Sequence, residues 1–411
     1  MISAFTSQAS PSSSSLLASG VKPVAKAIHT PEQSLTARWV PINRSFITLT
    51  KIILRAARER LGLANLAITL SCVTQQGYRH LLLVQPGDDI QLAAAGRVED
   101  IIISTDMPLS PECERLDVRN AITLPVDMNR QRLGYLVATL PDPGNTDAMS
   151  NGEQLPGQLA AINDEIIGVI KRYQTRYRAI YVYGDQCYWI GNSQALRELD
   201  QRISHIASSA RPVLVVANKG SGKIIAARTL HCERHTGIVP FIESNCAEWQ
   251  AGATTSILRS LYHYADGGTL FLRNIDRLPE SEQALLQTFV NETINTALAH
   301  LRRPPVDLVM TLSQRQTPLS DSLAQWLRSN TNALQLPELT QRSADIRDLV
   351  RFFVQDHSRQ QNIVLSEATW QQLESYPWSN NVHGLKQLID EAIRRCKTMV
   401  IDDELILSCL A

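Results

Sequence analysis

The chain has 411 residues, of which 44% are hydrophobic, so it is long enough to fill the cores of two or three domains. Lys plus Arg and Asp plus Glu number 40 each, which excludes a bulk electrostatic attraction to a nucleic-acid backbone. The seven cysteines are widely spaced and form no CxxC pair, which indicates reduced thiols and not a zinc site.

The N-terminal segment is rich in serine and poor in apolar residues, so residues 1–33 are predicted to be a disordered tail. Its serines interrupt any apolar run of the about 7 to 15 residues that a secretory signal needs. No stretch approaches the roughly 18 apolar residues of a membrane span. A cytoplasmic protein with no membrane partner is therefore expected.

Residues 34–152 predict an α+β domain. The run that begins at Leu66 alternates in hydrophobicity, and together with the run after the TQQG turn it predicts an antiparallel hairpin. Further strands are predicted at 101–104, 122–126 and 133–140. Before the hairpin, one apolar stripe predicts a helix ended by Gly62, and it runs through Phe46, Leu49, Ile53, Ala57 and Leu61.

The last strands of this domain, ITLPVDMNRQRLGYLVATL, resemble the closing strands of a GAF domain, a small-molecule sensor module. Many α+β domains share this pattern of hydrophobicity, so a generic interaction domain is the alternative. The sequence indicates no ligand, because Cys72 and His80 are interpreted as core and surface residues and not as a metal or haem site.

A loop rich in Pro, Gly, Asn and Asp leads into a predicted signalling helix, and residues 153–189 are assigned to this helix and a linker. The apolar stripe of the helix fits pairing with its twin in a dimer or packing back on the N-terminal sheet, and two heptads do not decide between them. The stripe consists of Leu159, Ile162, Ile166, Val169 and Tyr173.

The remainder of the chain predicts an α/β fold. An apolar run at 213–217 is followed by a Gly-rich loop and a helix from Lys223, which is the context of a phosphate-binding loop (P-loop). Further strands are predicted at 239–244, 269–272 and 306–312. This alternation favours a parallel sheet with helices on both faces.

Four segments in this region resemble the AAA+ module of the sigma-54 transcription activators in order and spacing. They are IGNSQALRELDQRI, RPVLVVANKGSGKIIAARTLH, VPFIESNCAEW and ADGGTLFLRNIDRLPESEQALL. LPELTQRSADIRDLVRFF and YPWSNNVHGLKQLIDEAI resemble the family's helical lid. The resemblance covers Ile190 to the C-terminus and implies a P-loop AAA+ α/β subdomain at 190–338 and a lid at 339–411.

The P-loop keeps half of its expected chemistry. Ala217 replaces the leading glycine, and Ile224 stands where P-loop proteins use Ser or Thr and this family often uses Glu, so it offers magnesium no oxygen. Backbone N–H groups and a cation for phosphate oxygens are still supplied by Gly220, Ser221, Gly222 and Lys223.

The strand at 269–272 ends without the two acids that the resemblance implies for holding metal and water. Arg273 and Asn274 stand there instead, and because a guanidinium repels Mg²⁺, ordinary magnesium binding is not expected. Either Arg273 replaces the metal by bonding phosphate oxygens directly, or it points to solvent in an empty site. Asp276 is placed past the active position, as a cap of the following turn.

The resemblance implies three more nucleotide contacts. Ser313 takes the place of an Asn that reads the γ-phosphate, and His383 replaces a nucleotide-sensing arginine of the lid. Ser322 and Arg328 stand where the family sends two arginines into the neighbouring subunit. The expected ligand is ATP or ADP, and the alternative is a fossil loop with Lys223 on a surface helix.

Two family features are missing. Activators of this family carry a long loop, whose GAFTGA tip touches sigma factor, between the segments that correspond here to Asn245-Cys246-Ala247 and ADGG. In this chain the two segments are joined only by EWQAGATTSILRSLYHY, which predicts one helix and no such loop. No helix-turn-helix follows the lid, so no direct nucleic-acid contact is expected. Arg394, Arg395 and Lys397 are interpreted as a solvated helix end.

These departures indicate a regulatory protein derived from sigma-54 activators that binds nucleotide but is impaired in hydrolysis. It is expected to act through a protein partner, either an intact activator of the same family or a second copy of itself, in a homo- or hetero-oligomer. One alternative is a slow ATPase that remodels a partner complex. The other is a GAF-type ligand sensor with the AAA+ core as an oligomer scaffold.

Overall fold

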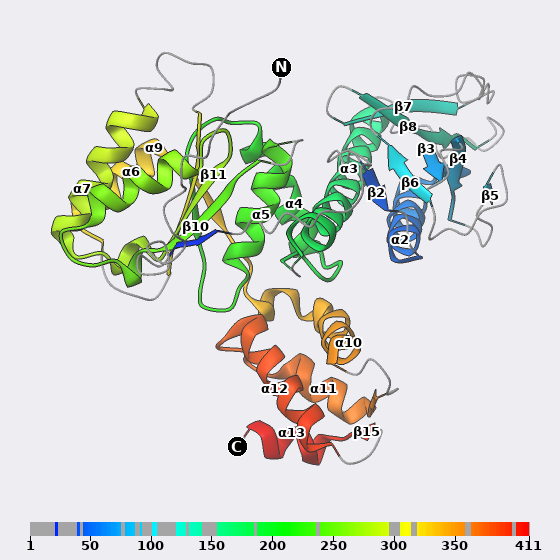
Figure 1. Ribbon diagram of the computed structural model, residues 1–411. Coiled ribbons are helices and arrows are strands. Elements are labelled where there is room, and N and C mark those ends of the chain that lie inside the picture. Colours follow the sequence, from blue (N-terminus) through cyan, green and yellow to red (C-terminus); the bar gives the residue numbers. More distant parts are fainter. Residues whose placement is uncertain are drawn as a thin grey trace, which may run out of the picture.

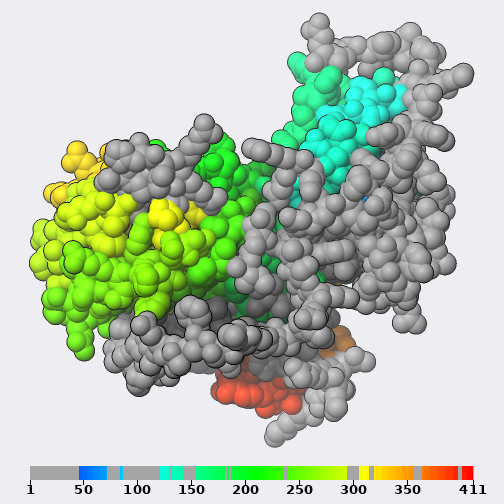
Figure 2. All heavy atoms as spheres, turned by 45° about the horizontal axis from the view of Figure 1, so that its top comes forward, coloured from blue at the N-terminus to red at the C-terminus, as the bar shows by residue number. Residues whose placement is uncertain are grey.

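The described chain consists of an N-terminal domain, an α/β subdomain and a helical lid (Figure 1). Figure 2 separates the green and yellow atoms of the α/β subdomain from the cyan atoms of the N-terminal domain. No helix in the described ranges is long and apolar enough to cross a membrane. The computed structural model describes residues 21–23, 39–41, 44–74, 79–86, 91–92, 101–104, 121–128, 131–141, 154–184, 187–235, 239–295, 305–313, 319–357, 363–396 and 400–410.

The N-terminal domain is an antiparallel sheet with helices packed against it. Its elements are β2 (Trp39–Pro41), α2 (Arg44–Leu61), β3 (Asn65–Thr74), β4 (Arg79–Val84), β5 (Gln91–Leu92), β6 (Ile101–Ser104), β7 (Ala121–Met128) and β8 (Gln131–Thr139). The strand order is β2-β6-β3-β4-β5, and β8 pairs with both β3 and β7. The predicted helix, hairpin and late strands are confirmed, whereas the GAF resemblance stays a prediction.

Helix α3 (Leu155–Arg178) packs back on the N-terminal domain and continues into the π-helical turn η4 (Ala179–Tyr183). Its apolar stripe shares one core with α2, β3 and β8. The structure therefore shows the second of the two packing modes that the sequence left open. The stripe is buried within the chain, at 0 to 7% exposure, in Leu159, Ile162, Ile166, Val169 and Tyr173.

The α/β subdomain is built on five parallel strands with one antiparallel edge strand. They are β1 (Val21–Pro23), β9 (Val213–Val216), β10 (Phe241–Asn245), β11 (Thr269–Arg273), β12 (Asp307–Leu312) and β13 (Asn332–Gln335), in the order β1-β10-β11-β12-β9-β13. Strand β1 departs from the predicted tail, since it pairs with β10 and satisfies the open backbone groups of that edge. Residues 1–20 and 24–33 lie outside the described residues.

Helices cover both faces of this sheet, as predicted. Side chains of α4 (Gln194–Ala207) and α5 (Lys223–Arg234) form the core of one face. The other face is covered by α6 (Thr254–Tyr264), α7 (Glu280–Val290) and α9 (Asp321–Asn330). The prediction of one helix before the ADGG segment is also confirmed, because α6 is that helix. The short turns are η5 (Cys246–Glu248), η6 (Ile275–Arg277) and η7 (Asn291–Asn295).

The lid is a helical subdomain with its own core and a small parallel sheet. Arg394 and Arg395 at the C-terminal end of helix α12 lie on a solvated face, and both pair with Glu391 of the same helix. Its elements are η8 (Leu339–Asp345), α10 (Ile346–His357), β14 (Val364–Leu365), α11 (Glu367–Ser375), α12 (Asn381–Arg395), β15 (Val400–Ile401) and α13 (Asp403–Leu410).

The Asp345 carboxylate attaches the lid to the segment that opens the α/β subdomain. One oxygen accepts the backbone N–H groups of Asn192 and Ser193, each at 2.7 Å, and the other accepts the Ser193 hydroxyl at 2.7 Å. A Cβ at Gly191, where φ is +109°, would lie 2.3 Å from the Asp345 carboxyl carbon. The close approach therefore requires glycine at this position.

Polar contacts join α3 to the α/β subdomain. Arg172 forms a buried ion pair with Asp200 of α4, with side chains 5% and 8% exposed. The preceding residue of α3, Lys171, has its Nζ 3.0 Å from Glu233 Oε2 of α5. Breaking a buried pair leaves an uncompensated charge and costs about 3 to 5 kcal/mol, so α3 is held firmly between the two domains.

His231 lies at the centre of a buried cluster between α5 and α3. Its Nδ1 is 2.8 Å from Thr269 Oγ1, and the side chain is fully buried. Burial lowers the pKa of His231 well below its usual value, and the charges of Arg178, His235 and Arg228 lower it further. The folded protein therefore holds this imidazole neutral.

The low pKa of His231 predicts an acid-sensitive fold. The unfolded chain titrates His231 near its usual pKa of about 6.5, so below that pH the unfolded state binds a proton that the folded state refuses. The free energy of unfolding should then fall by up to about 1.4 kcal/mol per pH unit as the pH drops below about 6.5. Urea unfolding between about pH 7.5 and 5.5 measures this slope.

Two glutamine variants separate His231 from the other titrating groups. His231→Gln can keep a hydrogen bond to Thr269 and should flatten the slope, whereas His205→Gln, at an exposed position on α4, should leave it unchanged. Equal slopes in the wild type and in His231→Gln would show that another group is responsible.

Candidate functional site

The P-loop keeps a phosphate-loop backbone between β9 and α5. Gly220 and Gly222 have φ of +81° and +96°, and Gly222 is the N-cap of α5. Among the described residues, positive φ outside glycine is confined to Asn274 and Asn381, so Ala217 is not strained in the P-loop. Ser221 is 1% exposed, and Ile224 packs against the core between α4, α5 and the sheet.

Lys223 has its ammonium folded into the loop. Its Nζ donates to the carbonyl oxygens of Ala217 at 2.9 Å and Asn218 at 3.3 Å. Burial is the largest influence and lowers the pKa of Lys223, the Asp276 carboxylate opposes this, and the Arg273 guanidinium adds to it. The amine is therefore held between one opposite charge and one like charge.

Arg273 at the end of β11 forms an ion pair with Glu243 on the neighbouring strand β10. Its Nη1 donates to Glu243 Oε1 at 2.7 Å. The Glu243 side chain is 10% exposed and the Arg273 side chain 45%, so the carboxylate is inside and the guanidinium reaches outward. Neither of the two readings from sequence included this partner, and Arg273 does not point free into solvent.

Asn274 completes the strand end with neutral hydrogen bonds. It adopts a left-handed backbone, with φ of +55°, and its N–H donates to Thr311 Oγ1 at 3.1 Å. Its Nδ2 donates to Asn245 Oδ1 at 2.8 Å. The Asn274 side chain is a neutral amide that already donates to Asn245, so it provides no carboxylate to bind a metal ion or to orient a water molecule. No cluster of three or more His, Cys, Asp or Glu side chains able to hold a metal ion is found in the described part of the chain.

Asp276 differs from its predicted role as an external cap. It lies within the turn η6, is 3% exposed, and its charge acts on Lys223 of the P-loop. Asp276 is therefore a buried carboxylate whose charge favours the protonated form of the P-loop lysine.

Two of the three remaining predicted contacts lie at this site. Ser313 follows β12 directly, and since the register pairs Leu312 with Val216, it lies at the same sheet edge as the P-loop. His383 of α12 lies beside the loop, because its Cβ is 3.0 Å from the place of a Cβ on Gly220. Arg328 lies on α9, which covers the opposite face of the sheet, and is exposed.

The sequence did not indicate the contacts between P-loop and lid. Asn381 Nδ2 donates to Lys219 O at 3.1 Å, and the Asn381 Oδ1 accepts the N–H of Leu339 at 2.9 Å. Asn218 also donates to the Glu338 carboxylate. Asn381 belongs to the lid text that carried the resemblance, but only its left-handed backbone, with φ of +50°, shows why an asparagine stands there.

Gly220 should tolerate alanine much less well than a glycine with the same backbone. Gly220 and Gly252 both have φ of +81°, but a Cβ on Gly220 would lie 2.0 Å from Asn380 O, whereas Gly252 has nothing within 4 Å. Gly252→Ala should cost about 1 to 2 kcal/mol of stability from φ alone. Gly220→Ala should cost at least about 2 kcal/mol more, because the lid backbone must move.

Thermal and urea unfolding of both variants measures this difference. Equal losses in Gly220→Ala and Gly252→Ala would mean that the lid does not press on the P-loop in solution.

Family comparisons agree with this architecture. Residues 190–300 match the sigma-54 interaction domain, and residues 340–409 match the AAA+ ATPase lid domain. In the crystal structure of NtrX from Brucella abortus in complex with ADP, 63% of the chain aligns with 62% of this one, at a TM-score of 0.48 and 18% identity. The two domain matches, taken with the parallel sheet and the helical lid described above, identify the fold as an AAA+ α/β sheet with a helical lid.

Curated relatives match the same region. The sigma54-dependent transcriptional regulator SfnR of Pseudomonas fluorescens is 28% identical over 234 residues, which are 51% of this chain and 64% of that protein. The DNA-binding transcriptional activator HyfR of Escherichia coli is 31% identical over 238 residues, 51% of this chain and 34% of that protein. The chain thus spans less than two thirds of either relative. Residues 190–300 thus resemble the sigma-54 interaction domain and residues 340–409 the AAA+ lid, and the curated relatives that match this region include sigma-54-dependent transcriptional regulators.

Proposed function

We propose that the protein is a transcription regulator of the sigma-54-dependent type that binds ATP or ADP but does not hydrolyse it, and that acts through a protein partner. The observation that carries this proposal is the ion pair of Arg273 and Glu243 at the end of β11, beside a P-loop that keeps its glycine backbone and Lys223. Hydrolysis in P-loop proteins needs a placed metal and an oriented water. Here a guanidinium and an amide occupy the strand end.

Binding is supported by the groups that the site retains. The glycine backbone at Gly220 and Gly222 leaves N–H groups for phosphate, and Lys223 supplies a cation within the loop. Arg273 uses one nitrogen on Glu243 while its side chain stays 45% exposed. Its other N–H groups can bond phosphate oxygens and take over the charge neutralisation that Mg²⁺ otherwise supplies.

The partner is an intact activator of the same family or a second copy of this chain. The α/β subdomain and lid are complete enough to dock on a neighbour of the same architecture, and exposed Arg328 on α9 is the residue that would reach it. Between Cys246 and Tyr264 the described chain forms one short turn and helix α6. We therefore propose that control is exerted on the partner and not by a moving loop on sigma factor.

Nucleotide binding should not depend on magnesium. Calorimetric titration of ATP into the purified protein should give the same Kd within about threefold in EDTA and in excess Mg²⁺, because protein cations neutralise the phosphates. Lys223→Ala should weaken binding at least about tenfold, the loss expected for one charge-assisted contact. Phosphate release should not exceed that of Lys223→Ala.

A double variant provides the matched control. Arg273→Asp with Asn274→Glu restores two acids next to Glu243, so nucleotide binding should become Mg²⁺-dependent. Robust Mg²⁺-dependent phosphate release by the wild type would overturn the proposal. Absence of nucleotide binding under both conditions would leave the fossil loop as the correct interpretation.

Association with the partner should depend on Arg328. Arg328→Glu should lower the fraction of the protein that co-purifies with an intact activator or forms oligomers in the presence of ATP, because the charge facing the neighbouring nucleotide is reversed. Arg259→Glu, at an exposed position on helix α6, should leave this fraction unchanged. A wild-type protein that stays monomeric and co-purifies with no partner would contradict the partner proposal.

A further inference from the structure

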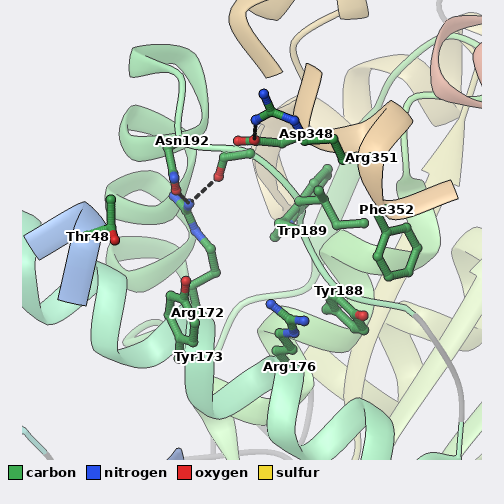
Figure 3. Close-up of a pocket in the computed structure, with 12 residues that line it drawn as sticks. Thr48, Arg172, Tyr173, Arg176, Tyr188, Trp189, Asn192, Asp348, Arg351 and Phe352 are labelled. Atoms are coloured by element: carbon green, nitrogen blue, oxygen red, sulfur yellow. Dashed lines mark hydrogen bonds and ion pairs between the residues drawn. The ribbon is translucent and has the colours of Figure 1, made fainter. Parts of the chain in front are cut away.

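A cavity of about 400 Å³ lies where the N-terminal domain, the linker and the lid meet (Figure 3). We call it the junction pocket. Helix α2 contributes Thr48, α3 contributes Arg176, the linker contributes Tyr188, and α10 contributes Arg351 and Phe352. It is thus built from segments that are distant in sequence, and its volume is typical of small-molecule sites.

Aromatic rings and a guanidinium line one side of the junction pocket. The Tyr188 and Phe352 rings meet edge to face, with centroids 5.9 Å apart. The Arg176 guanidinium carbon lies 4.9 Å from the centroid of the Tyr188 ring, and Figure 3 shows these two side chains close together. Tyr188 is 3% exposed, whereas Phe352 and Arg176 are half-buried. A flat ligand ring could therefore meet the Phe352 ring and the outer face of the Arg176 guanidinium, since both accept a planar partner.

The charges around the pocket are unevenly compensated. Arg172 is committed, since it pairs with Asp200 and donates to Gly191 O at 2.7 Å. Arg351 has Asp348 as a partner at 3.6 Å, on the same helix. Arg176 has no carboxylate partner among the described residues, and its recorded partner is the Tyr188 ring. Counting only residues that the structure describes, the pocket thus carries one guanidinium without a carboxylate partner.

We propose that the junction pocket binds a small aromatic carboxylate, with the ring on Phe352 and the carboxylate on Arg176, which the buried Tyr188 ring supports from beneath. One surplus positive charge matches a monoanion, and a guanidinium can hold a carboxylate through two parallel hydrogen bonds. The Thr48 hydroxyl on the opposite wall can donate to or accept from a polar substituent of the ring. This site is separate from the P-loop and can be filled without a bound nucleotide.

A bound carboxylate would connect the N-terminal domain to the lid. Arg176 belongs to α3, which packs on the N-terminal sheet, whereas Phe352 belongs to α10 of the lid. A ligand that contacts both stabilises the arrangement in which these elements are adjacent. The N-terminal domain and the AAA+ module would then share a small-molecule signal at their common boundary.

The test uses 2-naphthoate as the probe and isothermal titration of the full chain. We expect saturable binding in the micromolar to low millimolar range. Two comparison probes each lack one part of the proposed chemistry: 2-naphthalenemethanol has the ring without the charge, and acetate has the charge without the ring. Each should bind at least about tenfold more weakly than 2-naphthoate.

Variants locate the binding. Arg176→Gln should weaken 2-naphthoate at least about tenfold. Arg132→Gln is the matched control, because Arg132 also lies over a tyrosine, at 5.4 Å from the Tyr135 centroid, but is far in the chain and paired with Asp127. Lys223→Ala should not change the affinity, which separates this site from the P-loop.

Phe352→Leu provides a second test, because it removes the ring on which the ligand would stack and keeps an apolar side chain in the lid. This variant should also bind 2-naphthoate more weakly. The absence of saturable binding would overturn the proposal, as would an affinity for 2-naphthoate that is the same in the wild type, Arg176→Gln and Phe352→Leu. Circular dichroism of each variant establishes that it is folded before it is titrated.

Discussion

The Asp345 carboxylate determines where the lid stands relative to the rest of the chain. It is completely buried and accepts hydrogen bonds from Asn192 and Ser193, which precede α4. A buried carboxylate that lost these donors would carry a large desolvation cost, so the lid and the start of the α/β subdomain are attached as one unit. The contacts of the lid with the P-loop and the walls of the junction pocket both depend on this attachment.

At the P-loop, electrostatic balance is reached among protein groups. Two cations, Lys223 and Arg273, are opposed by two carboxylates, Asp276 and Glu243. A divalent cation near the end of β11 would meet a guanidinium that is already paired, and at an effective dielectric of about 20 two such charges 4 Å apart repel by about 4 kcal/mol per unit charge. A nucleotide without metal adds negative charge to a site in which the exposed side of Arg273 is still available. On the proposed function, the residues at this strand end would favour a nucleotide without metal, while the glycines of the P-loop keep their positive φ.

Much of this fold was predictable from the sequence, because periodicity and loop chemistry report local structure. The helix ended by Gly62, the antiparallel hairpin and the P-loop context of Lys223 follow from patterns of a few residues, and the structure contains all three. The pairing of α3 with its own sheet was not predictable, since a stripe of apolar residues does not specify what it packs against.

The site shows the same limit. Positions 273 and 274 could be identified by their place after a strand, but the Glu243 partner of Arg273 comes from the register of two strands that are distant in sequence. Asp276 was placed outside the site because its approach to Lys223 depends on a 3₁₀ turn, which the spacing does not encode. The junction pocket is lined by side chains of the N-terminal domain, the linker and the lid, so no local sequence motif could predict it.

The two proposed ligands would act on neighbouring parts of one connection. The linker that supplies Tyr188 to the junction pocket continues through Trp189, which lies 3.0 Å from the place of a Cβ on Gly222 in the P-loop. A few residues later the same linker reaches Asn192 and Ser193, held by Asp345 of the lid. A ligand that favours one position of the linker therefore changes the free energy of binding at the other site, and this coupling is equal in both directions. If the proposed function holds, a signal from the N-terminal domain would reach the P-loop through the position of the lid and would need no hydrolytic cycle.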